Sequence, residues 1–260
     1  MKLCVFDTAE EASRQAALLI DAAVRNQPAT VLGLATGGTP LALYREMIRA
    51  CRAGTDYSRV TTFNLDEYCG LPASHPQSYR TFMDANLFSG LNIAPQNTHI
   101  PDGLASPAAH YCHAYEAEIR AAGGIDIQIL GIGSNGHIGF NEPGSAFDSR
   151  TRVVSLTPQT VRDNARFFHS PDAVPRSAIS MGIGTILEAR QCLLLGFGEK
   201  KAQAVRAALE GPATTDLPAS ALQSHPDVLV FLDKAAASAL SRRDQSSCHP
   251  VPKSRDENIF

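Results

Sequence analysis

The residues best suited to acid/base chemistry lie between Gly131 and Pro143, a stretch that we call the His137 segment. Its glycines expose backbone N–H groups and remove bulk, so a ligand can lie directly against the chain. His137 titrates near neutral pH and can cooperate with the carboxylate of Glu142 in proton transfer. A lone histidine after a strand is usually an ordinary polar residue, but the density of Gly, Asn, His and Glu here predicts a catalytic site.

Two adjacent carboxylates, Asp66 and Glu67, follow an earlier apolar run. Two acids at a strand end can have different roles. If one of them is desolvated, its pKa rises, and its carboxylate can then act as a general base near a sugar carbon. The alternative is a solvated acidic loop without catalytic function, and an isolated Asp-Glu pair favours that alternative. The pair becomes a candidate site only in combination with other motifs.

A third candidate is the Thr36 turn, which comprises Thr36, Gly37, Gly38, Thr39 and Pro40. Thr39 is a suitable helix N-cap and Pro40 suits a first helical turn, so a helix is predicted to begin here. The glycines let the backbone approach an anion that the helix N-terminus attracts, which favours a phosphate. The alternative is a tight strand-to-helix turn. The spaced glycines of a dinucleotide-binding turn are absent, which argues against NAD.

The elements that must position these motifs alternate along the chain. Apolar, β-branched runs predict strands at 30–35, 60–65, 125–131, 192–197 and 228–233, and helical periodicity predicts helices at 41–52, 108–122, 200–210 and 235–242. Such alternation indicates an α/β fold with a Rossmann-like, doubly wound, mostly parallel sheet flanked by helices. Each motif follows a predicted strand, where ligands bind in such sheets. We expect one domain over residues 1–242 and a polar, weakly ordered tail over 243–260.

Charge and composition favour a small-molecule partner. The formal net charge of -3 provides no basic surplus for nucleic acid or an anionic membrane. Neither a secretory signal pattern nor an apolar run of about 18 residues is evident, so a cytoplasmic location is expected. The 6 cysteines show no paired spacing and no clustering with histidines, so we expect reduced thiols and no metal site.

Taken together, the motifs make the chain similar to the glucosamine-6-phosphate deaminase family, whose members convert the amino-sugar phosphate to fructose 6-phosphate and ammonia. The resemblance extends from Val31 to about Leu232. Besides the three motifs above, it includes Asn64-Leu65-Asp66-Glu67-Tyr68, Gly70-Leu71-Pro72, His75-Pro76, Ser78-Tyr79, Ser149-Arg150-Thr151-Arg152, Asn164-Ala165-Arg166-Phe167-Phe168 and Met181-Gly182-Ile183-Gly184-Thr185.

The resemblance implies a cofactor-free and metal-free mechanism. It assigns the opening of the sugar ring to His137, which Asn135 and Glu142 would orient, and the proton transfer between C2 and C1 to Asp66. It places the substrate phosphate on Thr36, Gly37, Gly38, Thr39, Arg166 and Lys201. Lys200 lies beside Lys201, so this last assignment is open by one residue.

Two positions depart from the pattern of some family members. Asn135 replaces an Asp, and an amide lacks the charge that stabilises imidazolium, so we expect a less basic His137 with function intact. Val154 replaces a basic residue that allosteric members use, so we expect weak or absent activation by N-acetylglucosamine 6-phosphate. The sequence leaves open the choice between glucosamine and galactosamine 6-phosphate, and whether copies of the chain assemble into a homo-oligomer.

Two rival functions are weighed against this one. A 6-phosphogluconolactonase shares the fold, but that family follows its His with a Thr-Ala-Ser-Leu-Phe-Pro type run, which is absent between Ile138 and Glu142. A sugar-phosphate sensor would need a DNA-binding element, and the segment before Thr30 is too short for a helix-turn-helix and the first element of the fold. The sequence therefore favours the deaminase.

Overall fold

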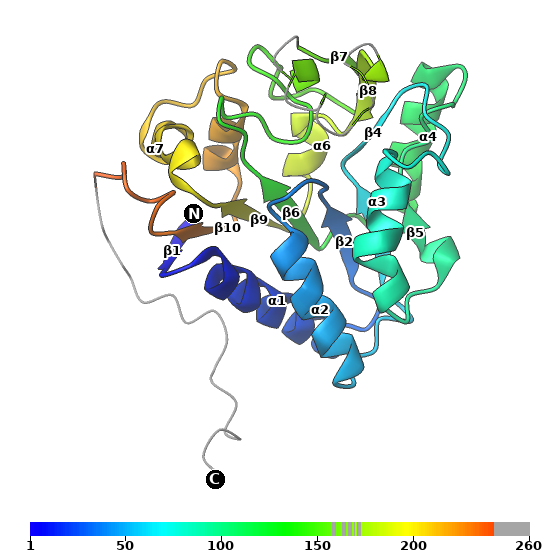
Figure 1. Cartoon of the computed structure of the whole chain (residues 1–260), viewed down its shortest axis with the longest axis horizontal. Coiled ribbons are helices and arrows are strands. Elements are labelled where there is room, and N and C mark those ends of the chain that lie inside the picture. Colours follow the sequence, from blue (N-terminus) through cyan, green and yellow to red (C-terminus); the bar gives the residue numbers. More distant parts are fainter. Residues whose placement is uncertain (158–159, 163–164, 166–167, 169, 171–172, 242–260) are drawn as a thin grey trace.

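Seven parallel strands form the central sheet of the computed structural model, which describes residues 1–157, 160–162, 165, 168, 170 and 173–241 (Figure 1). Every neighbouring pair in this sheet is parallel. In spatial order the strands are β1 (Lys2–Phe6), β10 (Val228–Asp233), β9 (Gln191–Gly196), β6 (Ile127–Gly131), β2 (Val31–Leu34), β3 (Thr61–Asn64) and β5 (Thr98–His99). Parallel neighbours need crossover connections, which place helices on the faces of the sheet.

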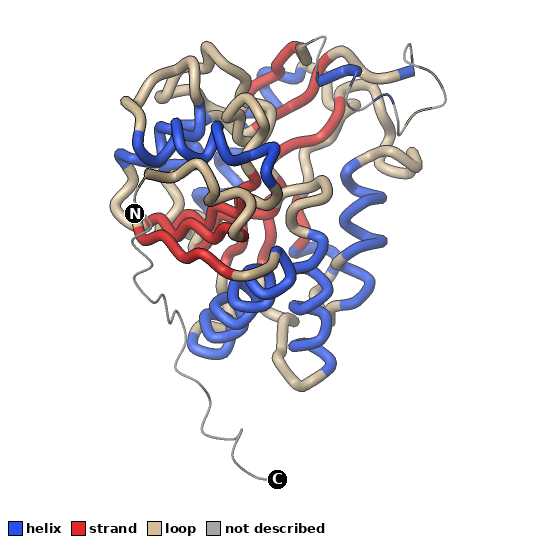
Figure 2. The backbone as a smooth tube through the Cα atoms, turned by 60° about the vertical axis from the view of Figure 1, so that its left-hand side comes forward, coloured by secondary structure: helices blue, strands red, loops and turns tan. Residues whose placement is uncertain are grey.

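Helices cover both faces of this sheet (Figure 2). One face carries α1 (Ala9–Asn26), α2 (Leu41–Arg52) and α3 (Tyr79–Asn86), and the other carries α4 (Ala108–Ala121), α6 (Ile183–Leu187) and α7 (Ala202–Glu210). Short 3-10 helices are η1 (Phe88–Gly90), η2 (Pro95–Asn97), η5 (Glu199–Lys201) and η6 (Pro218–Ser224). Successive strand residues point to opposite faces, so Ile129 packs with α1 and α2 whereas Leu130 packs with α4 and α7.

The strand order reverses between β2 and β6. From β2 the chain continues outward to β3 and β5, and from β6 it continues in the other direction to β9 and β10. Connections that leave the carboxyl ends of these two strands therefore diverge, and in sheets of this kind ligands bind at such a point. The Thr36 turn follows β2 and the His137 segment follows β6, so the topology brings these two motifs to the same place.

A second, antiparallel sheet lies beyond the carboxyl end of β3. It consists of β4 (Asp66–Tyr68), β8 (Ser177–Ser180) and β7 (Arg152–Ser155), in that order. Leu65 joins the two sheets, because its N–H donates to Leu34 O at 2.9 Å and its carbonyl accepts from Met181 N–H at 2.7 Å. The first residue of β4 is Asp66, so this sheet sets the position of that carboxyl.

The structure confirms the predicted fold class and most predicted elements. The strands agree within one or two residues, and the predicted bounds of α2 and β10 are those observed. The helix predicted at 235–242 is wrong: residues 234–239 form turns, with Ala236 N–H donating to Asp233 Oδ1 at 2.7 Å. Thr39 does not cap α2 either, because the residue before this helix is Pro40 and no side chain accepts from its first turn.

The expectation of reduced thiols fails at one position. Cys4 is disulfide-bonded, whereas Cys51, Cys69, Cys112 and Cys192 are free. The predicted tail at 243–260 and Arg166, a predicted phosphate ligand, lie outside the described residues. In the part of the chain that the structure describes, no helix is both long and apolar enough to cross a membrane.

Candidate active site

The His137 segment begins as a tight turn after β6. Gly133 N–H donates to His137 O at 2.9 Å and Gly136 N–H donates to Gly133 O at 3.1 Å. Gly136 has a φ of 83°, a backbone conformation that favours glycine. A Cβ on Gly133 would lie 2.4 Å from two atoms of the His137 imidazole, so the ring rests directly on the bare Gly133 backbone. The glycines therefore hold the imidazole as well as freeing space.

The His137 imidazole is oriented by Asn135, which in turn contacts Glu142. His137 Nδ1 lies 2.7 Å from Asn135 Oδ1, and Asn135 Nδ2 donates to Glu142 Oε2 at 2.8 Å. Glu142 Oε2 lies 3.8 Å from His137 Nδ1. A carboxylate can only accept, so the amide N–H faces Glu142 and the amide oxygen accepts from Nδ1–H. This assigns the imidazole lone pair to Nε2, which is the atom available for proton transfer.

Glu142 has a further partner that the sequence did not predict. Thr160 Oγ1 donates to Glu142 Oε1 at 2.5 Å, and Thr160 N–H donates to Thr157 Oγ1 at 3.1 Å. Both carboxylate oxygens of Glu142 are therefore hydrogen-bonded, which fixes the plane of the carboxylate beside Asn135. The sequence signal was weak, because a threonine 18 residues away from Glu142 matches no local pattern.

Asn141 fastens the end of the His137 segment to the second sheet. Its Nδ2 donates to Ile138 O at 2.9 Å and to Met181 O at 2.8 Å. Its Oδ1 accepts from Arg152 Nη1 at 2.9 Å, and Phe140 N–H donates to Ser180 Oγ at 3.2 Å. Strands β7 and β8 thus supply a rigid support on which the segment rests.

Asp66 lies against this segment and is almost fully buried, at 5% exposure. A Cβ on Gly139 would lie 3.4 Å from Asp66 Oδ2, so the carboxyl lies against Gly139. Gly139 is two residues after His137 in the chain. Burial, followed by the charge of Glu67, raises the pKa of Asp66 to about 8. The solvated-loop alternative is therefore wrong, and Asp66 has the properties of a strong carboxylate base.

The Thr36 turn presents open backbone at the start of α2. Gly37 has a φ of 89°, and Gly37 and Gly38 are exposed. Because no side chain caps α2, its first N–H groups are left for another acceptor. Thr39 packs on Gly131, with its Cβ 3.7 Å from a Cβ placed there, so the turn touches the base of the His137 segment.

Tyr79 connects the Thr36 turn to the His137 segment. Its ring stacks on Phe140 with centroids 6.1 Å apart and an interplanar angle of 6°. Burial raises the pKa of Tyr79 well above its ordinary value, and the hydroxyl hydrogen-bonds with Thr36 and Tyr68. Sequence reasoning assigned no role to Tyr79, although the Ser78-Tyr79 dipeptide was part of the resemblance.

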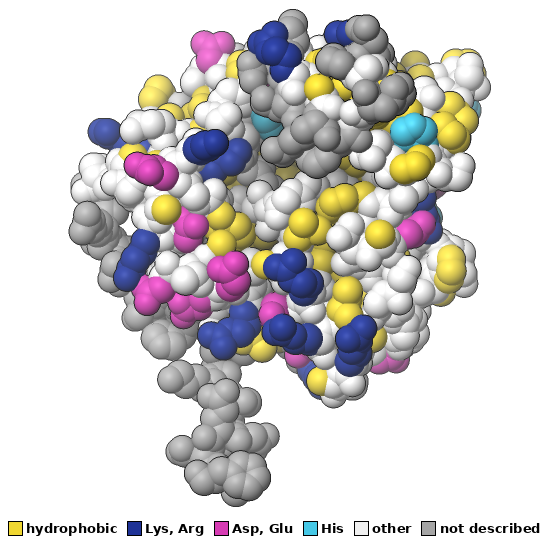
Figure 3. Space-filling view, in the orientation of Figure 1, with side chains coloured by type: hydrophobic (Ala, Val, Ile, Leu, Met, Phe, Trp, Pro, Cys, Tyr) yellow, Lys and Arg dark blue, Asp and Glu magenta, His cyan; other side chains and the backbone are white. Residues whose placement is uncertain are grey.

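Of the two residues predicted as cationic phosphate ligands, the structure describes only Lys201. Lys201 ends η5 at the start of α7 and is half-buried, whereas Lys200 is exposed. This difference favours Lys201 over its neighbour. Among the described residues, no group of three or more His, Cys, Asp or Glu side chains could hold a metal ion. On the face shown in Figure 3, basic and acidic side chains are interspersed among the described residues, without an extended surface of one sign.

A family model described as glucosamine-6-phosphate isomerases/6-phosphogluconolactonase matches residues 6–231. The chain belongs to this family. A glucosamine-6-phosphate deaminase from Shewanella loihica is 52% identical over 245 residues, covering 94% of this chain and 91% of the relative. A glucosamine-6-phosphate deaminase from Thermoanaerobacter pseudethanolicus is 49% identical, covering 94% of this chain and 97% of the relative.

Two solved structures show the same architecture. A monomeric glucosamine-6-phosphate deaminase of the NagB superfamily matches with a TM-score of 0.90 and 47% identity, over 92% of this chain and 100% of that chain. A 6-phosphogluconolactonase from Trypanosoma cruzi matches with a TM-score of 0.75 and 22% identity, over 93% of this chain and 97% of that chain. The second likeness concerns the fold alone.

Proposed function

We propose that this protein is a glucosamine-6-phosphate deaminase, which converts glucosamine 6-phosphate and water to fructose 6-phosphate and ammonia. One structural observation carries the proposal: the buried carboxyl of Asp66, just beyond β3, lies against Gly139, which is two residues after His137 in the segment that follows β6. An aldose-ketose isomerisation needs both a ring-opening acid/base and a base at carbon, and this site offers one of each. Relatives with this activity are about half identical to the chain.

His137 opens the ring. Its Nε2 takes the proton of the anomeric hydroxyl and returns it to the ring oxygen, which breaks the bond between that oxygen and C1. The imidazolium that forms in between keeps its Nδ1–H on Asn135, and Glu142 supplies a negative charge 3.8 Å away. Asn135 and Glu142 are thus orienting residues, and Thr160 holds Glu142 in place.

Asp66 moves the proton between carbons. Its carboxylate takes the proton from C2 of the open aldehyde, which gives an enol with the amino group on C2, and then delivers the proton to C1. Over the two steps the C1 oxygen gains a proton and the amine nitrogen loses one, which leaves a hydroxyl at C1 and an imine at C2. Water then adds to C2, and ammonia leaves. The buried position of Asp66 makes it a stronger base than an exposed carboxylate, which suits a proton on carbon.

The substrate phosphate is proposed to bind at the start of α2, on Thr36, Gly37, Gly38 and Thr39, with Arg166 and Lys201 as cationic partners. A dianionic phosphate is stabilised by the uncapped N–H groups there and by the helix dipole.

We further propose a single sugar-phosphate domain over 1–242, a tail over 243–260, and a cytoplasmic location, where phosphorylated sugars are retained by their charge.

Ammonia release tests the proposal. Purified protein is incubated with glucosamine 6-phosphate, galactosamine 6-phosphate or 6-phosphogluconolactone. Ammonia, fructose 6-phosphate and the acid released by lactone hydrolysis are then measured. We expect ammonia and fructose 6-phosphate from the glucosamine substrate, with loss of turnover but retained binding in Asp66→Asn. Hydrolysis of the lactone without ammonia release would assign the chain to the lactonases, and binding without turnover would indicate a sensor.

A further inference from the structure

Glu67 is a buried carboxylate that the proposed mechanism does not use. It is 2% exposed and directly follows Asp66 in β4. Successive residues of a strand point to opposite sides. Asp66 faces Gly139 of the His137 segment, whereas Glu67 lines a cavity of about 400 Å³ on the other side, together with Arg80 and Tyr115.

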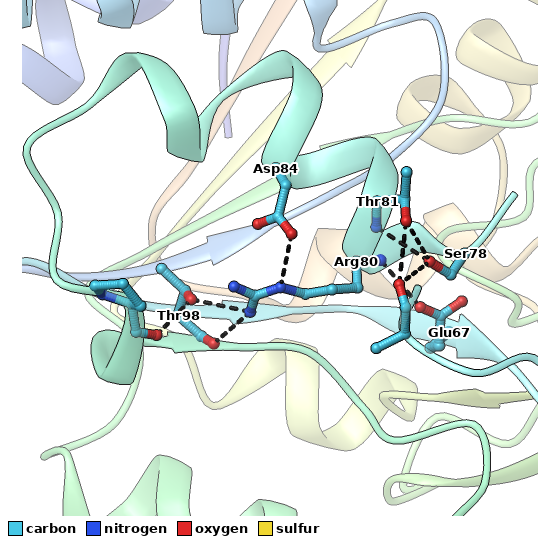
Figure 4. A network of polar contacts seen from close by, with 8 residues as sticks. Glu67, Ser78, Arg80, Thr81, Asp84 and Thr98 are labelled. Carbon is cyan, nitrogen blue, oxygen red and sulfur yellow. Dashed lines mark hydrogen bonds and ion pairs between the residues drawn. The ribbon is translucent and has the colours of Figure 1, made fainter. Parts of the chain in front are cut away.

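The Glu67 carboxylate caps the N-terminus of α3 (Figure 4). Its Oε1 accepts from Tyr79 N–H at 2.9 Å and from Tyr68 N–H at 2.8 Å, and its Oε2 accepts from Arg80 N–H at 3.0 Å. Ser78, the residue before α3, accepts from Thr81 N–H through Oγ at 3.1 Å. Glu67 thereby satisfies N–H groups that have no partner within the helix, and its charge lies at the positive end of the helix dipole.

Asp66 has no comparable partners. Among the described residues no hydrogen bond reaches its carboxyl, and its pKa is about 8 because of burial and of the Glu67 charge. Burial also raises the pKa of Glu67, but the N–H groups of Tyr79, Arg80 and Tyr68 act in the opposite direction. Hydrogen bonds to the anion favour ionisation, so when the pair holds one proton, that shared proton resides on Asp66 and the charge on Glu67.

The other titratable groups around the pair do not reverse this assignment. The charge of Asp66 acts on Tyr44, Tyr79 and Tyr115, and burial raises the pKa of each, so all three are neutral. On the cavity side the titratable groups are Cys69, Arg80, His99, Asp102, Tyr111, Tyr115 and Glu118. The charge of Asp102 raises the pKa of Glu67, but this effect is smaller than that of any of the three N–H groups. The Arg80 guanidinium extends away from Glu67 toward Asp84, to which it donates at 3.1 Å (Figure 4).

We infer that Glu67 is a positioning residue for the proposed base: its carboxylate anchors β4 to α3, and its charge makes Asp66 the stronger base of the pair. The kinetic part of this inference rests on the proposed deaminase function. Asp66 would then be the carboxyl that gains and loses the proton, while Glu67 stays ionised throughout the cycle.

The pH dependence of Glu67→Gln tests the charge. Since kcat/KM requires ionised Asp66, its acid limb should move to lower pH by about one unit when the neighbouring charge is removed, and the plateau of kcat should fall. Glu67→Asp keeps the charge and should keep the limb near its original pH. Ser78→Ala is the matched control, because it weakens the same helix start without changing the charge, and its limb should not move.

If Glu67→Gln folds and the acid limb of its kcat/KM profile stays at the wild-type pH, the inference is overturned. An equal displacement in Ser78→Ala would also overturn it, because the effect would then come from the helix start and not from the charge. If Glu67→Gln does not fold, the wild-type titration described next decides the matter alone.

A titration that needs no activity separates this inference from the proposed function. Wild-type protein labelled with ¹³C at Asp and Glu carboxyl carbons is titrated by NMR between about pH 5 and 10. The signal of one buried carboxyl should titrate near pH 8 and should be absent from Asp66→Asn. If that signal persists in Asp66→Asn, Glu67 carries the shared proton and the inference fails, whether or not the protein releases ammonia.

Discussion

Replacing Gly133 with alanine should damage catalysis far more than folding. The new Cβ would lie 2.4 Å from Cε1 and Nδ1 of His137, whereas ordinary contact begins at 3.4 Å. The imidazole must therefore retreat by about 1 Å, which also breaks its 2.7 Å contact with Asn135 Oδ1. A displacement of that size costs about 10²-fold in rate, or about 2.7 kcal/mol of barrier.

The fold should tolerate Gly133→Ala. Gly133 has no positive φ, so alanine introduces no backbone strain there. The His137 side chain is 35% exposed and can move toward solvent. We therefore expect an unchanged thermal midpoint, measured by circular dichroism, beside the loss of kcat/KM in a coupled ammonia assay.

Gly131→Ala is the matched control for Gly133→Ala. Its Cβ would meet nothing closer than Thr39 at 3.7 Å, so activity should stay within about twofold of wild type. If Gly133→Ala kept kcat/KM within about threefold of wild type, or lost stability in proportion to activity, His137 would not be held by the bare backbone and the reasoning would be wrong.

Three further outcomes follow from the site. The raised pKa of Asp66, about 8, means that this residue favours the folded state while protonated and that its contribution is lost as pH rises through about 8. Asp66→Asn should therefore unfold at a higher temperature than wild type at about pH 9 but not at about pH 4, and equal midpoints at pH 9 would contradict the buried charge. Asn135→Asp should make His137 more basic, seen by NMR titration of the ring, and an unchanged titration together with an unchanged pH profile would rule this out. N-acetylglucosamine 6-phosphate should leave the substrate saturation curve unchanged because of Val154, and a sigmoidal curve relieved by this ligand would disprove that expectation.

The central sheet could be predicted because its signals are local and strong. Strands that are buried on both faces appear as short apolar runs, so β10 at Val228–Asp233 was placed at its observed bounds. The orienting role of Asn135 was implied by the family resemblance, and the structure shows the contact between its Oδ1 and His137 Nδ1. The prediction of a helix at 235–242 was wrong, because a short alanine-rich run is a weak signal for a helix and the chain forms turns there instead.

The second sheet could not be predicted from local patterns. Strand β4 has three residues, and its partner β8 lies more than a hundred residues further along the chain. The position of Asp66 beside Gly139 depends on this pairing, so the residues alone indicated Asp66 only as one of two adjacent acids, and its role as the base came from resemblance to a family. Thr160 and Tyr79 were missed for the same reason, since their contacts with Glu142 and Thr36 exist only in the folded chain.

Asn135 limits the number of protonation states and ring orientations that the site has in solution. Unlike a carboxylate, its amide cannot gain or lose a proton, so the cluster with His137 and Glu142 has half as many protonation states as it would with Asp at this position. The amide also has two unlike ends, one of which donates to Glu142 while the other accepts from the imidazole. A larger fraction of the enzyme population therefore has one tautomer and one ring orientation before any substrate arrives.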